Sequence, residues 1–275
     1  MDLGLSGRKA IVLGSSQGLG YACALALARE GVQVWLNGRN AERLSQAAEK
    51  MRAELSAENA RLVAEGRAFV LKPIISMIAG DLTTPEGRSA ILAACTEPDI
   101  LVTNNAGPPP GKLDDWTAEV WASALQGNML GHILMIQGVV RGMQARKFGR
   151  VINITSAMVK APRSHQGLST TARAGLTAFS KALALDVAKD NVTLNNLLPE
   201  RIDTPRQQQL TERLMKSENL DFAQARHKLE QTVAAKRFGT PHEFGQACAF
   251  LCSVQASFIS GQNLQLDGGS YPGLI

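Results

Sequence analysis

Aromatic side chains are scarce in this sequence: they make up 5% of its 275 residues, and only two of them are tyrosines. Proteins that bind single-stranded nucleic acid stack bases on aromatic side chains along a basic groove. Here the lysines and arginines are scattered, and the formal net charge is only +5. We therefore expect no nucleic-acid binding, while the mild positive bias suits a small anionic ligand.

Long apolar runs are also absent. No stretch reaches the roughly 18 apolar residues of a membrane-spanning helix. The first residues, MDLGLSGRKAIVLGSS, lack a basic segment followed by an apolar run. The sequence predicts neither a membrane span nor a signal peptide, and we expect a cytoplasmic protein.

Cysteines number four, and all of them stand in Ala- or Leu-rich surroundings: Cys23, Cys95, Cys248 and Cys252. Cys248 and Cys252 lie four residues apart, on one face of a predicted helix, which leaves a metal or redox pair open. Packing as small apolar side chains is the favoured interpretation. No group of His, Cys, Asp and Glu has metal-ligand spacing, so we expect no metal site, and the cysteines fit a reducing cytoplasm.

Short β-branched or aliphatic segments alternate with Ala- and Leu-rich segments of helical spacing along the sequence. Strands are predicted over residues 9–13, 32–36, part of 69–79, 99–103, 150–154, 192–197 and 263–266. Helices are predicted over residues 21–30, 41–65 (one long or two short), 85–95, 115–146 with a break, 169–189 and 241–253. This alternation predicts the α/β class, as a single Rossmann-type, doubly wound domain over residues 1–275 with a mostly seven-stranded parallel sheet.

Residues 206–235 interrupt the alternation with a polar, amphipathic stretch. Asp221 and Gln224 stand there at capping-box spacing, which indicates the start of a helix. No linker or internal repeat borders the stretch. We interpret it as a helical excursion from the sheet rather than a second domain.

A glycine-rich turn follows the first predicted strand. Its sequence, Gly14-Ser15-Ser16-Gln17-Gly18-Leu19-Gly20, has the spacing Gly-x-x-x-Gly-x-Gly and opens a helix. Glycine lets a backbone turn tightly and approach a phosphate, and a helix N-terminus favours negative charge. The strand, turn and helix together predict a pyrophosphate-binding βαβ unit.

Further motifs follow the glycine turn in order along the chain. They are Gly80-Asp81-Leu82, Asn104-Asn105-Ala106-Gly107, Asn128 in GNMLGH, Ser156 in INITSA, the loop 199–204, Arg237-Phe238-Gly239-Thr240-Pro241, and Ser260-Gly261 with Asp267-Gly268-Gly269. Over nearly its whole length the sequence resembles the short-chain dehydrogenase/reductase family, with a general likeness to its 3-oxoacyl-carrier-protein reductase-like members. The resemblance implies a nicotinamide cofactor, a small-molecule carbonyl or alcohol substrate, a substrate lid at 206–235 and a homotetramer or homodimer.

The same resemblance assigns residues to the cofactor site. They are Gly14, Ser16, Gln17, Gly18, Leu19, Gly20, Asp81, Leu82, Asn105, Ala106, Gly107, Arg173, Pro199, Ile202 and Thr204. Arg39 is added because the second strand ends in Leu36-Asn37-Gly38-Arg39-Asn40, without the carboxylate that holds the ribose of NAD. Its guanidinium fork suits a 2′-phosphate, which predicts NADP(H) over NAD(H); the alternative is that Arg39 only solvates the end of the strand.

The family's catalytic tyrosine and lysine are missing. In the family they stand four residues apart, which puts both on one face of a helix, and Ala-Gly-Leu follows the lysine. In this sequence Ala174-Gly175-Leu176 follows Arg173, so Arg173 takes the lysine position and Ser169 the tyrosine position. Lys181 stands too late, and the two tyrosines, Tyr21 and Tyr271, lie outside this helix. The expected catalytic residues are therefore Asn128, Ser156, Ser169 and Arg173.

The exchange removes the usual proton donor. Serine is a far weaker acid than a phenol, and arginine stays protonated at working pH. Loss of a positioned general acid typically costs about 10²–10⁴ in rate. Ser156, Ser169 with an ordered water, or His165 and Lys160 on the loop between the serines remain as substitutes, whereas His132 is interpreted as a packing residue.

Two functions stay open at this point. One is an NADP(H)-dependent oxidoreductase that reduces a carbonyl or oxidises an alcohol with a modified proton donor. The alternative is a protein that binds NADP(H) without significant turnover, in a sensing or structural role. Glu200 is expected to bring a negative charge near the nicotinamide in either case.

Overall fold

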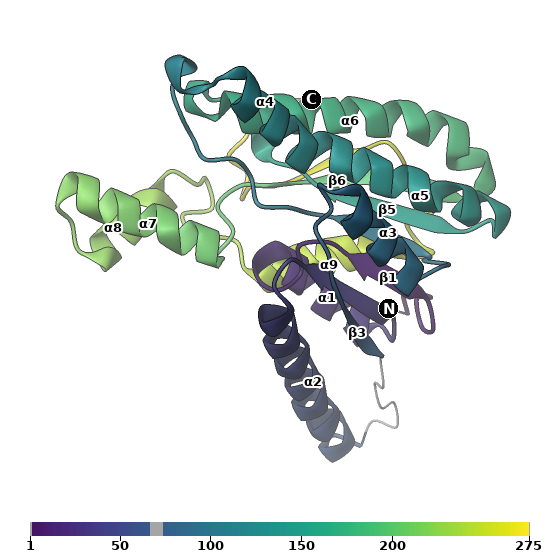
Figure 1. Cartoon of the computed structure of the whole chain (residues 1–275). Helices are drawn as coiled ribbons and strands as arrows, with labels where there is room; N and C mark the ends of the chain where they lie inside the picture. The colour runs from purple at the N-terminus through teal and green to yellow at the C-terminus, as the bar shows by residue number, and fades with distance from the viewer. Residues whose placement is uncertain (1, 67–73, 275) are drawn as a thin grey trace.

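A sheet of seven parallel strands lies between two layers of helices (Figure 1) in the computed structural model, which describes residues 2–66 and 74–274. The strands are β1 (Lys9–Val12), β2 (Gln33–Gly38), β3 (Ile75–Ala79), β4 (Ile100–Thr103), β5 (Gly149–Ile154), β6 (Val192–Pro199) and β7 (Asn263–Leu266). The helices include α1 (Gly18–Arg29), α2 (Ala41–Ala64), α3 (Pro85–Ala94), α4 (Ala118–Leu125), α5 (Gly131–Ala145), α6 (Gly167–Val187), α7 (Pro205–Glu218), α8 (Phe222–Gln231) and α9 (Pro241–Cys252). The predicted Rossmann-type, doubly wound α/β fold is confirmed.

The strands lie in the order β3-β2-β1-β4-β5-β6-β7, so the side on which successive strands are added changes at β1. The chain first builds outward from β1 to β3 and then returns to place β4 on the other side of β1. In such sheets the crevice that receives a ligand opens at this point, outside the carboxyl ends of the strands. The glycine turn at the end of β1 lies at this edge.

Two hydrophobic cores cover the two faces of the sheet. Neighbouring residues of β1 show this directly, because Val12 packs in the core that includes Phe244 of α9, whereas Ile11 packs in the core that includes Met135 of α5. Side chains alternate across a strand, so both residues are buried only if both faces are covered. This is why the central strands are nearly continuous apolar runs in the sequence.

The structure specifies four of the predicted segments in more detail. Residues 41–64 form one long helix and not two short ones. The predicted helix 115–146 begins at Ala118, and a π-helical turn, Gln126–Leu130, joins α4 to α5 in place of a break. The helix expected from Ser169 begins earlier, at Gly167. Of the predicted strand segment 69–79, residues 69–73 lie outside the described residues, and β3 accounts for the rest.

The segment 206–235 forms two helices that project from the body of the domain (Figure 1). The predicted capping box is present: the Gln224 amide donates to Asp221 at 2.8 Å, and the Asp221 amide donates to the Gln224 side chain at 3.0 Å. Its role as a lid, like the limits of the single domain, stays a prediction.

All four cysteines are buried and unpaired, as expected for packing residues. Burial raises the pKa of the Cys252 thiol well above its usual range, which keeps it protonated. No group of three or more metal-ligating side chains is found within the described ranges. Among the helices described, none combines the length and apolarity that crossing a membrane requires.

Candidate active site

A cleft of about 720 Å³ opens at the carboxyl edge of the sheet, beside the reversal point. It is lined by almost all residues predicted for the site: Gly14, Ser16, Gln17, Gly18, Leu19, Arg39, Asp81, Leu82, Asn105, Ala106, Gly107, Ser156, Ser169, Arg173, Pro199, Ile202 and Thr204. Gly20 and Asn128 do not line it. Both contact residues that do line it: Gly20 packs against Gly14, and Asn128 accepts a hydrogen bond from Arg173.

Gly20 allows the glycine turn to close. A Cβ atom at this position would lie 2.4 Å from the carbonyl oxygen of Gly14, so any side chain would push the turn open. Gly14 itself has a φ of +56°, and its carbonyl accepts a hydrogen bond from the Asn104 side chain at 3.0 Å. The turn is thereby fixed to the end of β4, with the N-terminus of α1 facing the cleft.

Arg39 and Arg43 supply positive charge at the end of the cleft near β2. The Arg39 side chain is 74% exposed, and its nearest carboxylate oxygen, on Asp81, lies 3.9 Å away. Asp81 instead accepts hydrogen bonds from the amide and hydroxyl of Thr83, at 2.9 and 2.7 Å. Arg39 is thus held loosely and is free to pair with an incoming anion.

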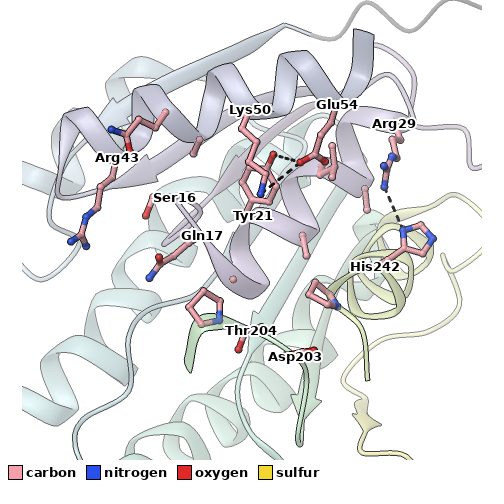
Figure 2. Close-up of a pocket in the computed structure, with 18 of the residues that line it drawn as sticks. Ser16, Gln17, Tyr21, Arg29, Arg43, Lys50, Glu54, Asp203, Thr204 and His242 are labelled. Atoms are coloured by element: carbon pink, nitrogen blue, oxygen red, sulfur yellow. Dashed lines mark hydrogen bonds and ion pairs between the residues drawn. The ribbon is translucent and has the colours of Figure 1, made fainter. Parts of the chain in front are cut away.

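A second pocket of about 950 Å³ lies on the other side of the glycine turn, between α1, α2 and the first residues of α7 and α9 (Figure 2). The residues that it shares with the cleft are Ser16, Gln17, Gly18, Arg43, Thr204, Pro205 and Gln209. Its other charged groups are also paired. Glu54 accepts from Tyr21 at 3.2 Å and lies 3.8 Å from Lys50, whereas Arg29 and Asp203 pair with Glu58 and Arg226, which do not line the pocket. Of the expected catalytic residues, Ser156, Ser169 and Arg173 line the cleft, and none of the four lines this pocket.

Ser169 and Arg173 lie on one face of α6, as their spacing predicts. The buried guanidinium of Arg173 donates to the carbonyl oxygens of Ile154 and Thr155, at 2.8 and 2.7 Å, and so binds the end of β5. Its Nε donates to Ser169 Oγ at 3.2 Å, and Nη2 donates to Asn128 Oδ1 at 3.4 Å. Burial, with a smaller effect of Arg206, lowers the pKa of Arg173 to about 10, so it remains protonated at neutral pH.

Asn128 acts on the cleft through this guanidinium. It lies in the π-helical turn, and its side-chain nitrogen donates to the carbonyl of Ala124 at 3.4 Å. Turns of this kind are frequent at functional sites because they re-aim side chains within a helix. The sequence motif located Asn128 but gave no sign of the π turn.

Of the substitute proton donors, Ser156 and His165 line the cleft and Lys160 does not. Ser156 caps a short turn after β5 and accepts a hydrogen bond from the Met158 amide at 3.2 Å, which leaves its hydroxyl proton to donate. Lys160 donates to Gln265 at 3.1 Å and lies over the ring of Tyr271. Lys160 is therefore engaged by the C-terminal segment instead of the cleft.

His132 is buried one helical turn after Asn128, in keeping with a packing role. Neither ring nitrogen has a hydrogen-bond partner among the described residues. Burial, together with the nearby charge of Arg173, lowers the pKa of His132 to about 3. The side chain is thus a neutral imidazole in the folded protein and carries no proton to the site at neutral pH.

Replacing His132 by leucine should flatten the dependence of stability on pH. Because the folded pKa lies below the ordinary value of about 6.5, the unfolded chain binds the extra proton as the pH falls, and folded stability is lost from pH 6.5 toward 3. At pH 5 this effect costs the wild-type protein about 2 kcal/mol. Denaturant unfolding at pH 7 and pH 5 measures it.

The matched control for this prediction is His227→Gln, at an exposed position on α8. That variant should keep the pH dependence of the wild-type protein. An unchanged pH dependence in His132→Leu would show that the buried imidazole does not limit stability in acid.

The mouth of the cleft carries arginines that the sequence reasoning missed. Arg163, Arg201 and Arg206 line it, and no motif or spacing marks them. Glu200, expected to place a negative charge there, is neutralised by Arg163 at 3.0 Å and lies 3.7 Å from Arg201. Among the apolar side chains of α7 and α8, Leu210 lines the cleft, whereas Leu214 and Phe222 do not.

Comparison with known proteins gives consistent results along the chain. The chain is 30% identical over 270 residues to the NADPH-dependent reductase BacG of Bacillus subtilis (strain 168), covering 97% of this chain and 98% of that protein. It is also 30% identical over 273 residues to the 3-oxoacyl-[acyl-carrier-protein] reductase FabG of Vibrio cholerae, covering 98% and 99%. The crystal structure of L-sorbose reductase from Gluconobacter frateurii, complexed with NADPH and L-sorbose, superposes with a TM-score of 0.89 at 29% identity and covers all of both chains.

The family comparison covers most of the chain, including the glycine turn, the strand ends of the cleft and α6. The family described as short chain dehydrogenase matches residues 8–214. The chain belongs to the short chain dehydrogenase family.

Proposed function

We propose that the protein is an NADP(H)-dependent oxidoreductase that reduces a carbonyl group, or oxidises the corresponding alcohol, without the family's tyrosine. The observation that carries the proposal is that one cleft holds both the glycine turn and the side chains of Ser156, Ser169 and Arg173. The family and the NADPH-dependent relatives support the reaction class. When bound, the nicotinamide supplies the hydride.

The cleft fits a phosphorylated dinucleotide at the residues that would hold it. The turn closed by Gly20 and the N-terminus of α1 suit the pyrophosphate, and Arg39 with Arg43 suits a 2′-phosphate. We expect NADPH to bind more tightly than NADH in a fluorescence titration. NADH binding at least as tightly would overturn the cofactor preference.

The residues at the end of β5 and on α6 supply the rest of the chemistry. Ser156 donates a hydrogen bond to the substrate oxygen, and Arg173 holds Ser169 in place. Because Ser169 Oγ already accepts from Arg173 Nε, its own proton is directed to another acceptor. We assign that acceptor to a water molecule that spans the volume of the absent phenol. As the hydride arrives, this water donates a proton to the substrate oxygen, and the hydroxide left behind takes up a proton from solvent through the open cleft.

Incubation with NADPH and a panel of ketones, ketoesters and quinones tests the reaction. The absorbance of NADPH should fall with at least one compound, and Ser156→Ala and Ser169→Ala should each lower that rate by about 10²–10⁴. The double variant Ser169→Tyr/Arg173→Lys should gain ketone reduction if the rest of the site is intact. Turnover that survives both alanine variants unchanged contradicts the assigned roles.

The second candidate is a protein that binds NADP(H) without significant turnover. One observation favours it: Arg173 donates to two protein carbonyls and two side chains, which leaves little of its guanidinium for a substrate. NADPH binding with no oxidation across the panel would support this candidate.

A cytoplasmic location and a homotetramer or homodimer also stay proposals. The apolar positions of α6 do not decide the oligomer, because Leu176 and Val187 are buried in the core of the chain itself. Exposed apolar side chains on the same side of the domain, Leu134 on α5 and Leu185 on α6, are the better candidates for a subunit contact.

A further inference from the structure

The mouth of the cleft holds more positive charge than its carboxylates balance. Arg163, Arg201 and Arg206 line it, and Arg173 lies deeper in the same cleft. Glu200 is the one carboxylate among the described residues that lines this part; the other lining carboxylate, Asp81, lies at the opposite end beside Arg39. Three arginines therefore face one carboxylate before Arg173 is counted.

Arg206 is the most available of these cations. It is exposed, it lies in the first turn of α7, and no ion pair or hydrogen bond of its guanidinium is found among the described residues. The nearest carboxylate along the loop, Asp203, is bound by Arg226 at 2.9 Å and lines the other pocket (Figure 2). Arg206 also lies near enough to Arg173 to lower its pKa, so its charge extends into the cleft.

The guanidinium of Arg201 is partly shielded from water, and its hydrogen-bonding capacity is not fully used. Its side chain is 16% exposed, and its buried Nε has no hydrogen-bond acceptor in the described part of the chain. The backbone at Arg201 has a φ of +53°, a left-handed conformation that is costly for a side chain of this kind. Such strain is typical of residues held in place at binding sites.

Like charges in a partly desolvated cleft repel, and an anion placed among them relieves the repulsion. Guanidinium groups bind carboxylate and phosphate oxygens through charge-assisted, often bidentate hydrogen bonds. The N-terminus of α7, where Thr204 caps the helix, adds a further favourable potential. Met158 and Leu210, which line the same region, leave an apolar surface for the rest of the molecule.

We propose that the substrate carries an anionic group, a carboxylate or a phosphate, that Arg206 and Arg201 hold at the mouth of the cleft while the carbonyl lies at Ser156. This inference rests on the proposed function, since it names the substrate class of the same site. Arg39 and Arg43 serve the cofactor at the other end, so the two sets of arginines have separate anions.

Calorimetric titration of the NADP⁺-loaded protein tests the inference without turnover. The probes are 4-phenylbutanoate, its uncharged amide, and 3-phenylpropylphosphonate. The carboxylate or the phosphonate should bind at least about 10-fold more tightly than the amide. Arg206→Gln should remove about 10-fold of the anion's affinity and leave the amide unchanged, and the tighter of the two anions identifies the group.

The control is Arg213→Gln, which removes the same charge from an exposed position of α7 outside the cleft. It should leave anion binding within about twofold of the wild type. Equal binding of anion and amide, or a loss of NADPH affinity in Arg206→Gln with anion binding intact, overturns the inference. Selective anion binding with no NADPH oxidation contradicts the proposed function alone, and oxidation with no preference for anions contradicts the inference alone.

Discussion

Arg173→Met should lower the rate of NADPH oxidation about 100- to 1000-fold and also destabilise the fold. The methionine keeps most of the volume but removes every donor, so Ser169 loses its orienting partner and the site loses its buried positive charge. The carbonyls of Ile154 and Thr155 lose a buried hydrogen bond, which should cost about 2 kcal/mol or more of unfolding free energy. Rates with an active compound of the panel and denaturant unfolding measure the two effects.

Arg146→Met separates the two effects. Arg146 is a partly buried arginine whose Nη2 donates to the Pro98 carbonyl at 2.7 Å, away from the cleft. Its replacement should cost stability and leave turnover intact. If Arg173→Met behaved in the same way, Arg173 would only hold α6 against the end of β5 and would take no part in the chemistry.

Gly20→Ala should weaken NADPH binding about 100-fold. The new Cβ would lie 2.4 Å from the Gly14 carbonyl oxygen and 3.0 Å from the Asn104 side chain, and the backbone atom cannot swing away as a flexible side chain would. Such overpacking costs about 1–3 kcal/mol, and the upper value corresponds to about 100-fold in affinity. A fluorescence titration with NADPH measures it, alongside unfolding without cofactor.

Two other glycines serve as controls for this variant. At Gly7, where φ is +79°, a Cβ would meet nothing within 4 Å, so Gly7→Ala adds backbone strain alone and should leave NADPH binding unchanged. At Gly245 the Cβ would lie 2.5 Å from the Ala22 carbonyl, so Gly245→Ala collides on the opposite side of α1. If Gly245→Ala weakened NADPH binding as much as Gly20→Ala, the loss would reflect displacement of α1 and not the turn.

Sequence patterns predicted the features of this protein that depend on residues close together in the sequence. The strands, the glycine turn and the shared face of Ser169 and Arg173 follow from spacings of a few residues. The π turn around Asn128 does not, because it depends on how α4 and α5 pack on α6 and Leu82, where Gly131 allows close approach. The start of α6 at Gly167 likewise depends on Trp116, against which that glycine packs.

The charges of the site required the tertiary structure. Glu200 was expected to bring a negative charge near the nicotinamide, yet Arg163, from a segment far away in the sequence, pairs with it. Lys160 and His165 were equivalent in the sequence, but only His165 lines the cleft. A single sequence shows which ionisable groups exist, whereas their partners are decided by loops that meet only in the folded chain.

The buried cysteines also allow local opening of the native protein to be measured by thiol labelling. Cys23, Cys248 and Cys252 lie in the core on one face of the sheet, and Cys95 lies in the core on the other. A thiol reagent added to the native protein can react only when the layer that covers a given cysteine separates from the sheet. Labelling rates followed by mass spectrometry would therefore time the opening of each layer independently, without introducing any probe into the sequence.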